Sequence, residues 1–398
     1  MSVLRTARAV LDLKWVGGMG AILVLVFLAV SLFSCGSGKL PQFGSTHNAY
    51  VTLPTLGSVA LLQINSLTGS ITVGAQTPQA TGTSPSGLAL LSNKYLYVAN
   101  SQANTISTFN VAADGTLTPG AAAIPTGGTS PHAAIIDPSG KYLLVTNSSL
   151  SDSVSVFSID TSSGVLTQVT GSPFSAYDTP TEIVMPASGN LVYASNPRIG
   201  TVTAFVFDTT STVCGVLLCP VAGSPFTSGK GASALVVDRS GQHLYVANTS
   251  AVNTQSTAIG NISGFNINTT TGVLSPIPGS PFTSNVGSGP STLVIDTEGN
   301  FLYATTPGSN YSVWCFEINS QTGSTDGQLT AVNGSPFSVV AGGLFALIDT
   351  KGSFLFIGDQ NANGISAYTY DQNSGQPTVI LNSPFSTGTA PGQMVFAD

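Results

Sequence analysis

Charged residues are scarce in this 398-residue chain. Asp, Glu, Lys and Arg make up 7% of it, against about 25% in ordinary soluble proteins. The 10 basic residues are outnumbered by 17 acidic ones and form no cluster. Nucleic-acid binding depends on clustered Lys and Arg that neutralise phosphates, so we expect no nucleic-acid partner. Hydrophobic residues make up 42%, which argues against disorder.

Residues that hold metals and cofactors are also few. The chain has 4 Cys and 3 His, and it lacks a nucleophile elbow, a phosphate loop and an HExxH motif. No Cys or His pair stands at the spacing of a zinc site, so we predict neither a metal nor a cofactor.

The N-terminal segment has the features of an export signal. Three basic residues precede an almost uncharged apolar run from Trp15 to Phe33. The run ends at Leu32-Phe33-Ser34-Cys35, which resembles the lipobox of bacterial lipoproteins, and this resemblance implies a lipid on Cys35. The alternative is a retained membrane anchor, since the run is about long enough to span a bilayer. Both interpretations tether the protein in the bacterial cell envelope, outside the cytoplasm.

The other cysteines fit an oxidising compartment. Cys214 and Cys219 bracket a short segment where another repeat has a tight turn, so we expect a local disulfide across a hairpin. Two free thiols are the alternative. Cys315 lies in an apolar strand and is expected in the core.

One motif recurs along the chain. Clear copies are Lys94-Tyr-Leu-Tyr-Val-Ala-Asn100 and Gly241-Gln-His-Leu-Tyr-Val-Ala-Asn248, and Ala49-Tyr-Val-Thr52 is a weak first copy. Seven copies end at residues 52, 100, 147, 196, 248, 306 and 359, so the period is 47 to 58 residues. Strand repeats of this period indicate a propeller, and we predict an all-β fold of seven four-stranded blades.

The strands of one repeat can be placed from their apolar patterns. His132 to Asp137 is a nearly continuous apolar run, as expected for a strand buried on both faces. The second and third strands cover Tyr142 to Asn147 and Val154 to Ile159, and the fourth begins at Val165. Gly171-Ser-Pro-Phe174 then leaves the blade. The exit recurs in later blades, and we expect its Phe to pack between blades rather than form a binding stripe.

The two ends of the propeller complement each other. Residues from Gly392 to Asp398 match a first strand with no second strand after it, and the copy near Tyr50 lacks that first strand. We therefore expect the C-terminal strand to complete the N-terminal blade and close the ring. The predicted organisation is a signal peptide at residues 1–35, a linker at 36–48 and a propeller at 49–398.

These repeats resemble the lactonase family of seven-bladed propellers, which includes propeller-type 6-phosphogluconolactonase and the YVTN-repeat proteins. The Tyr-Val-Ala-Asn strand, the Thr-Gly-x-Leu turn and the Ser-Pro-Phe exit carry the resemblance, over roughly residues 45 to 398. It implies hydrolysis of a lactone. The family's Pro-x-His segment is matched at His132, whereas its Gly-Pro-Arg-His segment is here Thr179-Pro-Thr-Glu182, without the Arg and the His.

Alternating strand directions place the connections on two faces. We term the face with the first-to-second and third-to-fourth turns the short-turn face, and the face with the second-to-third loops and the crossings between blades the loop face. The loop from Thr249 to Asn261 is long and its counterpart from Ser101 to Thr105 is short. Variable loops on a rigid scaffold often carry binding sites, so the loop face is the candidate.

The residue that starts each first strand should line the loop-face mouth of an axial channel. In order from the second blade these are Ser86, His132, Thr181, Ser233, Ser291, Leu344 and Gln393. Glu182 adjoins this ring, and His132 with Glu182 could act as general base and orienting carboxylate. The alternative is a satisfied polar pair that lines a water-filled channel.

Arg198 and Lys230 are the basic residues placed on the loop face, where they should be neighbours. They are the predicted clamp for an anionic ligand, and solvated charges are the alternative. Two functions therefore remain open. One is a propeller that binds a small polar ligand or a protein partner, and the other is a divergent lactone hydrolase.

Overall fold

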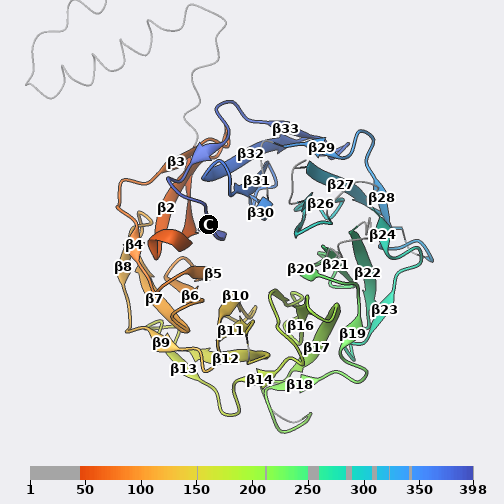
Figure 1. Ribbon diagram of the computed structural model, residues 1–398, viewed down its shortest axis with the longest axis horizontal. Coiled ribbons are helices and arrows are strands. Elements are labelled where there is room, and N and C mark those ends of the chain that lie inside the picture. Colours follow the sequence, from red (N-terminus) through yellow and green to blue (C-terminus); the bar gives the residue numbers. More distant parts are fainter. Residues whose placement is uncertain are drawn as a thin grey trace, which may run out of the picture. The chain divides into compact units, whose positions relative to one another are not determined.

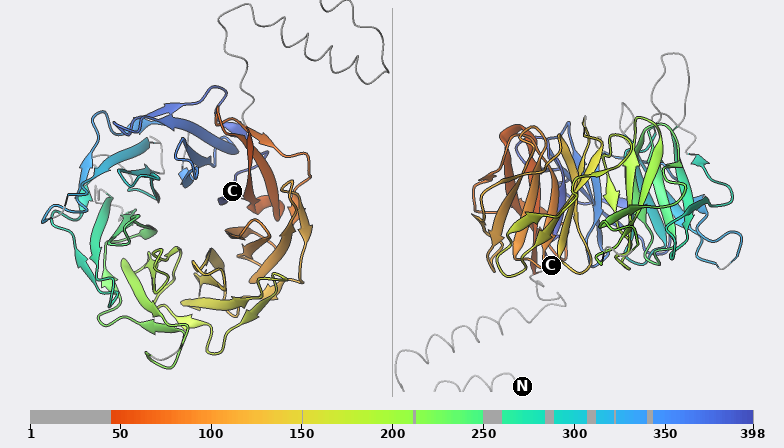
Figure 2. Two further views of the ribbon diagram at one scale, coloured as in Figure 1. Left: turned by 180° about the vertical axis from the view of Figure 1, so that it is seen from behind. Right: turned by 90° about the horizontal axis from the view of Figure 1, so that it is seen from below.

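The computed structural model describes residues 45–149, 151–210, 213–249, 260–283, 289–306, 312–321, 323–339 and 343–397. These residues form seven β-sheets arranged as a ring around a central axis (Figure 1). Seen edge-on, the sheets stand side by side and give the ring two faces (Figure 2). The predicted seven-bladed all-β propeller is confirmed.

Each blade has an antiparallel path of four strands. The innermost strands are β5 (Pro85–Leu91), β10 (Pro131–Ile136), β15 (Ile183–Val184), β20 (Ala232–Val237), β25 (Thr292–Ile295), β30 (Gly343–Ile348) and β35 (Met394–Ala397). The second strands are β1 (Thr46–Leu53), β6 (Tyr95–Asn100), β11 (Tyr142–Asn147), β16 (Leu191–Asn196), β21 (His243–Asn248), β26 (Phe301–Thr306) and β31 (Phe354–Asp359). The third strands are β2 (Ser58–Asn65), β7 (Thr105–Val111), β12 (Ser153–Ile159), β17 (Thr201–Phe207), β22 (Asn261–Ile267), β27 (Ser312–Ile318) and β32 (Gly364–Tyr370).

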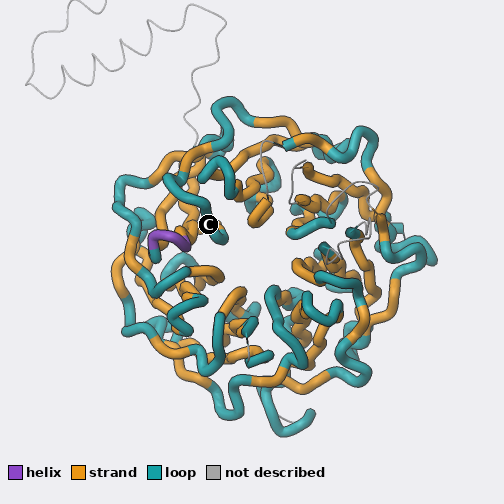
Figure 3. Tube along the Cα trace, in the orientation of Figure 1, coloured by secondary structure: helices purple, strands orange, loops and turns teal. Residues whose placement is uncertain are grey.

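The outer strand of each blade consists of two short segments that pair with the same third strand. These are β3 (Ile71–Val73) with β4 (Gln79–Ala80), β8 (Leu117–Pro119) with β9 (Ile124–Pro125), β13 (Leu166–Gln168) with β14 (Phe174–Ser175), β18 (Leu218–Pro220) with β19 (Phe226–Thr227), β23 (Leu274–Pro276) with β24 (Phe282–Thr283), β28 (Leu329–Ala331) with β29 (Phe337–Ser338), and β33 (Pro377–Val379) with β34 (Phe385–Ser386). The short helix η1 (Pro54–Leu56) joins β1 to β2 (Figure 3).

The sequence had indicated that the Gly-Ser-Pro-Phe segment leaves the blade, and this prediction is wrong. The segment continues the outer strand. Phe174 pairs with Val154 of β12 after the chain has passed through Pro173. Between the two outer segments the ladder is interrupted, and Ser172 Oγ accepts the Val156 N–H at 2.9 Å. The serine thus replaces a missing backbone acceptor, which satisfies a buried strand amide. The four later copies use their Ser in the same way.

Apolar side chains pack between neighbouring blades. One cluster joins Val156 and Phe174 of the third blade to Val192 and Phe205 of the fourth. The equivalent Phe residues of later blades lie in or against the next clusters, so the prediction that these aromatics pack between blades is confirmed.

A buried tyrosine reinforces five of the seven blade junctions. A tyrosine of the second strand donates its hydroxyl proton to the glycine carbonyl of the third-to-fourth turn in the next blade. It is the third residue of its strand, or the fifth in the longer β1. The pairs are Tyr50–Gly115 (2.7 Å), Tyr97–Gly164 (3.0 Å), Tyr193–Gly272 (3.1 Å), Tyr245–Gly327 (2.7 Å) and Tyr303–Gly375 (2.9 Å). Leu144 and Phe356 occupy this position in the third and seventh blades, so those junctions lack the bond. We term this contact the tyrosine latch.

The final asparagine of the motif also has a structural role. Asn147 donates from its side-chain nitrogen to Ser153 Oγ at 3.1 Å and Ser155 Oγ at 2.8 Å. Asn100 contacts Thr105 and Ser107 in the same way. The motif therefore fastens the second strand to the third, and its repetition reports folding rather than ligand binding.

The chain closes the ring as predicted. β35 pairs with β1, with Met394 opposite Val51 and Val395 opposite Tyr50. The predicted linker ends too late, because β1 begins at Thr46 and pairs with β2 from its first residue. No apolar pattern indicates this extension, since His47 and Asn48 are polar. The signal-peptide and lipidation predictions at residues 1–35 lie outside the described residues.

Candidate functional site

A belt of hydroxyl groups joins innermost strands near their loop-face ends. The side-chain hydroxyls of four predicted ring residues each lie within hydrogen-bonding distance of a backbone carbonyl oxygen in the next blade. The pairs of hydroxyl and carbonyl residues are Ser86 and Pro131 (2.8 Å), Thr181 and Ser233 (3.4 Å), Ser233 and Ser291 (3.4 Å), and Ser291 and Gly343 (3.2 Å). A hydroxyl has one proton, so these groups offer a ligand mainly their acceptor lone pairs. Exposed Leu344 interrupts the belt, and Gln393 is tied through its backbone N–H to Thr52 Oγ1 at 2.8 Å.

His132 replaces a hydroxyl in this belt. Its Nδ1 lies 2.7 Å from the carbonyl oxygen of Thr181 in the next blade. A carbonyl can only accept, so Nδ1 carries the proton and Nε2 keeps its lone pair. The side chain is solvent-exposed and belongs to the innermost strand β10. Desolvation by the surrounding strands lowers the pKa of His132, and the bond to Thr181 opposes this shift. The lowered pKa favours the neutral imidazole.

Glu182 is the residue after the carbonyl that holds His132. Desolvation raises the pKa of Glu182 to about 7, and the Ile183 N–H at 3.3 Å from its Oε1 partly offsets this. Among the described residues, no hydrogen bond or ion pair joins Glu182 to His132. The expected orienting carboxylate is thus replaced by the Thr181 carbonyl, because the chain brings a peptide group rather than the Glu182 side chain against Nδ1.

Arg198 is not the free cation that the sequence indicated. Its guanidinium pairs with Asp178, which is fully buried, and lies 3.9 Å from Asp152. Asp178 also accepts the Ile199 N–H at 3.1 Å. The sequence had not singled out Asp178, since it lies in a crossing between blades and belongs to no repeated motif. Two carboxylates thus balance one guanidinium, so Arg198 has little positive charge left for a ligand.

Lys230 lies beside the Arg198 loop, as expected. Gly231 donates its N–H to the Pro197 carbonyl at 3.1 Å, and Ser228 donates to the Gly200 carbonyl at 3.0 Å. The lysine is exposed and forms no ion pair with any residue that the structure describes. The predicted clamp of two cations is therefore reduced to this single lysine.

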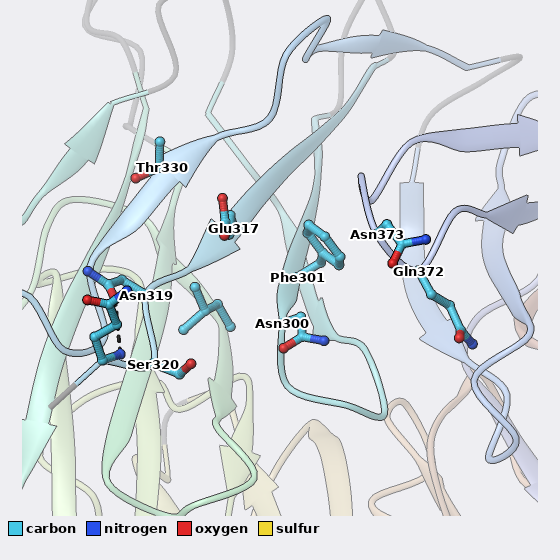
Figure 4. A pocket seen from close by; sticks show the side chains of 10 residues that line it. Asn300, Phe301, Glu317, Asn319, Ser320, Thr330, Gln372 and Asn373 are labelled. Atoms are coloured by element: carbon cyan, nitrogen blue, oxygen red, sulfur yellow. Dashed lines mark hydrogen bonds between the residues drawn. The ribbon is translucent and has the colours of Figure 1, made fainter.

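The short-turn face is more hollowed than the sequence indicated. A cleft of about 490 Å³ lies at the outer rim between blades six and seven, where amide side chains and Glu317 surround Phe301 (Figure 4). Two further cavities, of about 620 and 330 Å³, lie between innermost strands near this face. Aliphatic residues predicted to be buried on both sides, such as Ile135 and Val236, are half-exposed there. Sequence alone cannot separate a core position from an apolar wall.

Cys214 and Cys219 form a disulfide, with their Cα atoms 6.0 Å apart. Cys315 is a free, buried thiol in β27. No three His, Cys, Asp or Glu side chains within the described ranges gather closely enough to hold a metal ion. No helix within those ranges is long and apolar enough to cross a membrane.

A model of the lactonase seven-bladed β-propeller family matches residues 42–185, 174–341 and 269–392, which together cover the ring except for its closing strand β35. The chain belongs to the lactonase family. No curated protein sequence matches it significantly.

Solved structures resemble this lactonase-family propeller along nearly their whole length. The periplasmic gluconolactonase of Pseudomonas aeruginosa has 19% identity and a TM-score of 0.73, with 89% of this chain and 99% of that chain covered. A 6-phosphogluconolactonase candidate from Bacteroides fragilis has 19% identity and a TM-score of 0.70, with 90% and 100% covered. A similar candidate from Bacteroides uniformis has 18% identity and a TM-score of 0.71, with 88% and 99% covered. At these identities the likeness shows the fold alone.

Proposed function

We propose that this lactonase-family propeller binds a small neutral polyhydroxylated ligand, such as a sugar or a sugar lactone, at the loop-face end of its channel. One observation carries the proposal, namely the pairing of Arg198 with Asp178 and Asp152. With that charge balanced, the groups left on this face are the His132 imidazole, the Glu182 carboxyl, the belt of hydroxyl lone pairs and one exposed lysine, Lys230. Sugar hydroxyls both donate and accept, so they match this set better than a phosphate does.

Calorimetric titration with neutral sugars and their phosphorylated counterparts tests the proposal. We expect the neutral compounds to bind, and His132→Ala to weaken binding roughly 10-fold, because one hydrogen bond to the ligand is lost. Lys141→Ala is the control, since Lys141 lies in a turn of the opposite face. Tighter binding of the phosphorylated compounds that disappears in Arg198→Ala would overturn it. Lack of binding by any sugar would favour a protein partner on the loop face.

Lactone hydrolysis is a second candidate, favoured by the fixed tautomer of His132. Nε2 has the free lone pair that a general base needs. It would take a proton from water as the oxygen attacks the lactone carbonyl, and the proton would pass to the alkoxide when the ring C–O bond breaks. A Glu182 carboxyl with a pKa near 7 is partly protonated at neutral pH, so it can donate to the oxygen on which charge develops.

A panel of lactones assayed at several pH values separates the two candidates. Hydrolysis through His132 should persist below pH 6.5, because the pKa of the base is lowered, and should fall sharply in His132→Ala. Circular dichroism confirms that the variant is folded. Full activity in the double variant His132→Ala, Glu182→Gln would exclude this pair as catalytic residues.

The proposed location is the bacterial cell envelope, with a lipid on Cys35. The support is the basic N-terminal residues, the apolar run before Cys35 and the fold shared with a periplasmic gluconolactonase. Cys35→Ser should abolish palmitate labelling and leave an uncleaved precursor. Unchanged label and mobility in this variant would contradict lipidation at Cys35.

A further inference from the structure

The short-turn end of the channel is lined by aliphatic side chains. In every blade the innermost strand ends with apolar residues, and in five successive blades these residues line cavities. The half-exposed members are Ile135, Ile136, Val184, Met185, Val236, Val237, Val294, Ile295 and Leu347. Exposed apolar surface that is continuous across several strands is uncommon on a protein without an apolar ligand or partner.

Two cavities meet at this surface. The larger, about 620 Å³, follows β20, β25 and β30, and the smaller, about 330 Å³, follows β10, β15 and β20. Val236 and Val237 line both, so the two hollows share a wall. Both volumes lie in the range of about 300–1,000 Å³ that is usual for small-molecule sites. Predominantly apolar walls with a few polar groups at one end are also typical of such sites.

The larger cavity has two cations at its rim. Arg239 and Lys351 come from the first-to-second turns of blades five and seven, and both are exposed. Arg239 donates to the Thr297 carbonyl at 2.7 Å, and neither side chain forms an ion pair with a described residue. Asp296 is buried and accepts the Phe301 N–H at 2.7 Å, whereas Glu298 is exposed at the rim. The rim of the cavity thus carries the two cations and the solvated carboxylate of Glu298. The Asp296 carboxylate is occupied by a hydrogen bond within its own turn.

We propose that the short-turn end of the channel binds an aliphatic monocarboxylate, with its alkyl chain along Val236 and Val237 and its carboxylate between Arg239 and Lys351. The apolar walls favour the chain through the hydrophobic effect. The unpaired cations favour a singly charged head group, and Glu298 disfavours a second negative charge.

This site is separate from the sugar site proposed above. The innermost strands run from one to the other, so Ser233 of β20 belongs to the hydroxyl belt and Val237 of the same strand belongs to the apolar wall. A sugar would leave its hydroxyls unpaired against the aliphatic wall, which is costly. Neither proposal depends on the other.

Titration of the whole exported protein with decanoate tests the inference. The decanoate concentration is kept below the level at which decanoate forms micelles. Acetate supplies the head group without the chain, decanol the chain without the charge, and decyltrimethylammonium the opposite charge. We expect saturable decanoate binding, weak or no binding of acetate, and weaker binding of the cation. Arg239→Gln keeps a donor for the Thr297 carbonyl but removes the charge, and Lys351→Gln removes the other.

Each charge variant should weaken decanoate binding roughly 10-fold and leave decanol binding unchanged. Lys94→Ala is the matched control, because Lys94 is a basic turn residue of the same face outside both cavities. Val237→Asp should abolish binding of both decanoate and decanol. Val237→Thr is a milder change that should weaken binding of both, and it replaces the aspartate variant if that variant does not fold. The inference is overturned if decanoate does not saturate the protein, or if both charge variants bind decanoate as tightly as the parent protein does.

Discussion

The junction between the third and fourth blades differs from the five junctions that carry a tyrosine latch. At the latched junctions a buried hydroxyl joins the blades, as Tyr245 does with Gly327. Here Leu144 takes the tyrosine position, His132 replaces a belt hydroxyl, and Arg198 joins Asp152 of one blade to Asp178 of the crossing into the next. Repeated contacts maintain the ring, and at the third junction a departure from the repeat is combined with an ion pair between Arg198 and Asp178.

The closing junction, between the seventh and first blades, is the other one without a tyrosine latch, and it differs from the third junction. Phe356 lacks the hydroxyl of the latch, but β35 adds a strand to β1 and packs Met394 into the core. Departure from the repeat therefore does not by itself mark a site. At the closing junction it is compensated by backbone pairing, whereas at the third it is accompanied by charge.

Among the changes that test this comparison of junctions, loss of the closing strand should lower the free energy of unfolding the most. Removing residues 392–398 uncovers the edge of β1 and leaves a cavity where Met394 was 5% exposed. We expect a loss of at least about 4 kcal/mol in the free energy of unfolding. Denaturant titration measures it, with removal of Asp398 alone as the control. An unchanged transition would show that this junction closes without β35.

Asp178→Asn should have the next largest effect, because it breaks the ion pair peculiar to the third junction. Loss of a hydrogen bond between charged groups typically costs about 1.5–3 kcal/mol. The freed Arg198 should then bind phosphorylated sugars that the parent protein rejects, as calorimetry would detect. Asp152→Asn, at 3.9 Å from Arg198 and more exposed, should have a smaller effect on both measurements. Equal effects from the two variants would contradict the assignment of Asp178 as the main partner.

Tyr245→Phe tests the latch at an ordinary junction. The ring remains packed, but the Gly327 carbonyl loses its donor, so we expect a loss of about 1–2 kcal/mol. Tyr142→Phe is the matched control, since the Tyr142 hydroxyl lies at an unlatched junction and pairs with no described residue. Thermal unfolding compares them. A similar small shift for both would mean that the latch adds little beyond packing.

The smallest expected effect concerns pH. The pKa of Glu182 is about 7 in the folded protein and lower in the unfolded chain, so the folded state binds more protons between about pH 4.5 and 7. The contribution of the protonated Glu182 carboxyl to the free energy of unfolding is therefore lost as pH rises through that window. Glu182→Gln should be more stable than the parent at pH 8, by less than about 1 kcal/mol because Glu182 is only half-buried, and equal to it at pH 4. A constant difference across this range would refute the raised pKa.

The fold could be predicted because each blade repeats the same local solutions. The period, the strand patterns and the closing strand all follow from the motif ending in Asn100, Asn147 and their counterparts. The outer strand was the exception. Pro173 suggested an exit, since proline cannot donate to a ladder, and the substitution of Ser172 for the missing acceptor cannot be inferred from spacing.

The candidate site could be predicted only in outline. Aligning the repeats places His132 and Glu182 at the channel and brings Arg198 near Lys230, because all four follow the blade register. The pairing of Arg198 with Asp178 was missed, since the partner lies in a crossing whose path no repeat determines. Likewise, a backbone carbonyl such as that of Thr181 has no signature in a sequence.

The pairing of β35 with β1 also sets the order of events during folding. Asn48 opposite Ala397 is a contact across almost the full length of the described ring, so no rapid local step can form it. The six complete blades can assemble as the chain emerges, whereas the first waits with an open edge until the last strand arrives. Partly folded chains with open strand edges are prone to aggregate. Aggregation is therefore favoured while the edge of β1 that β35 covers is still open, although β2 already pairs with its other edge.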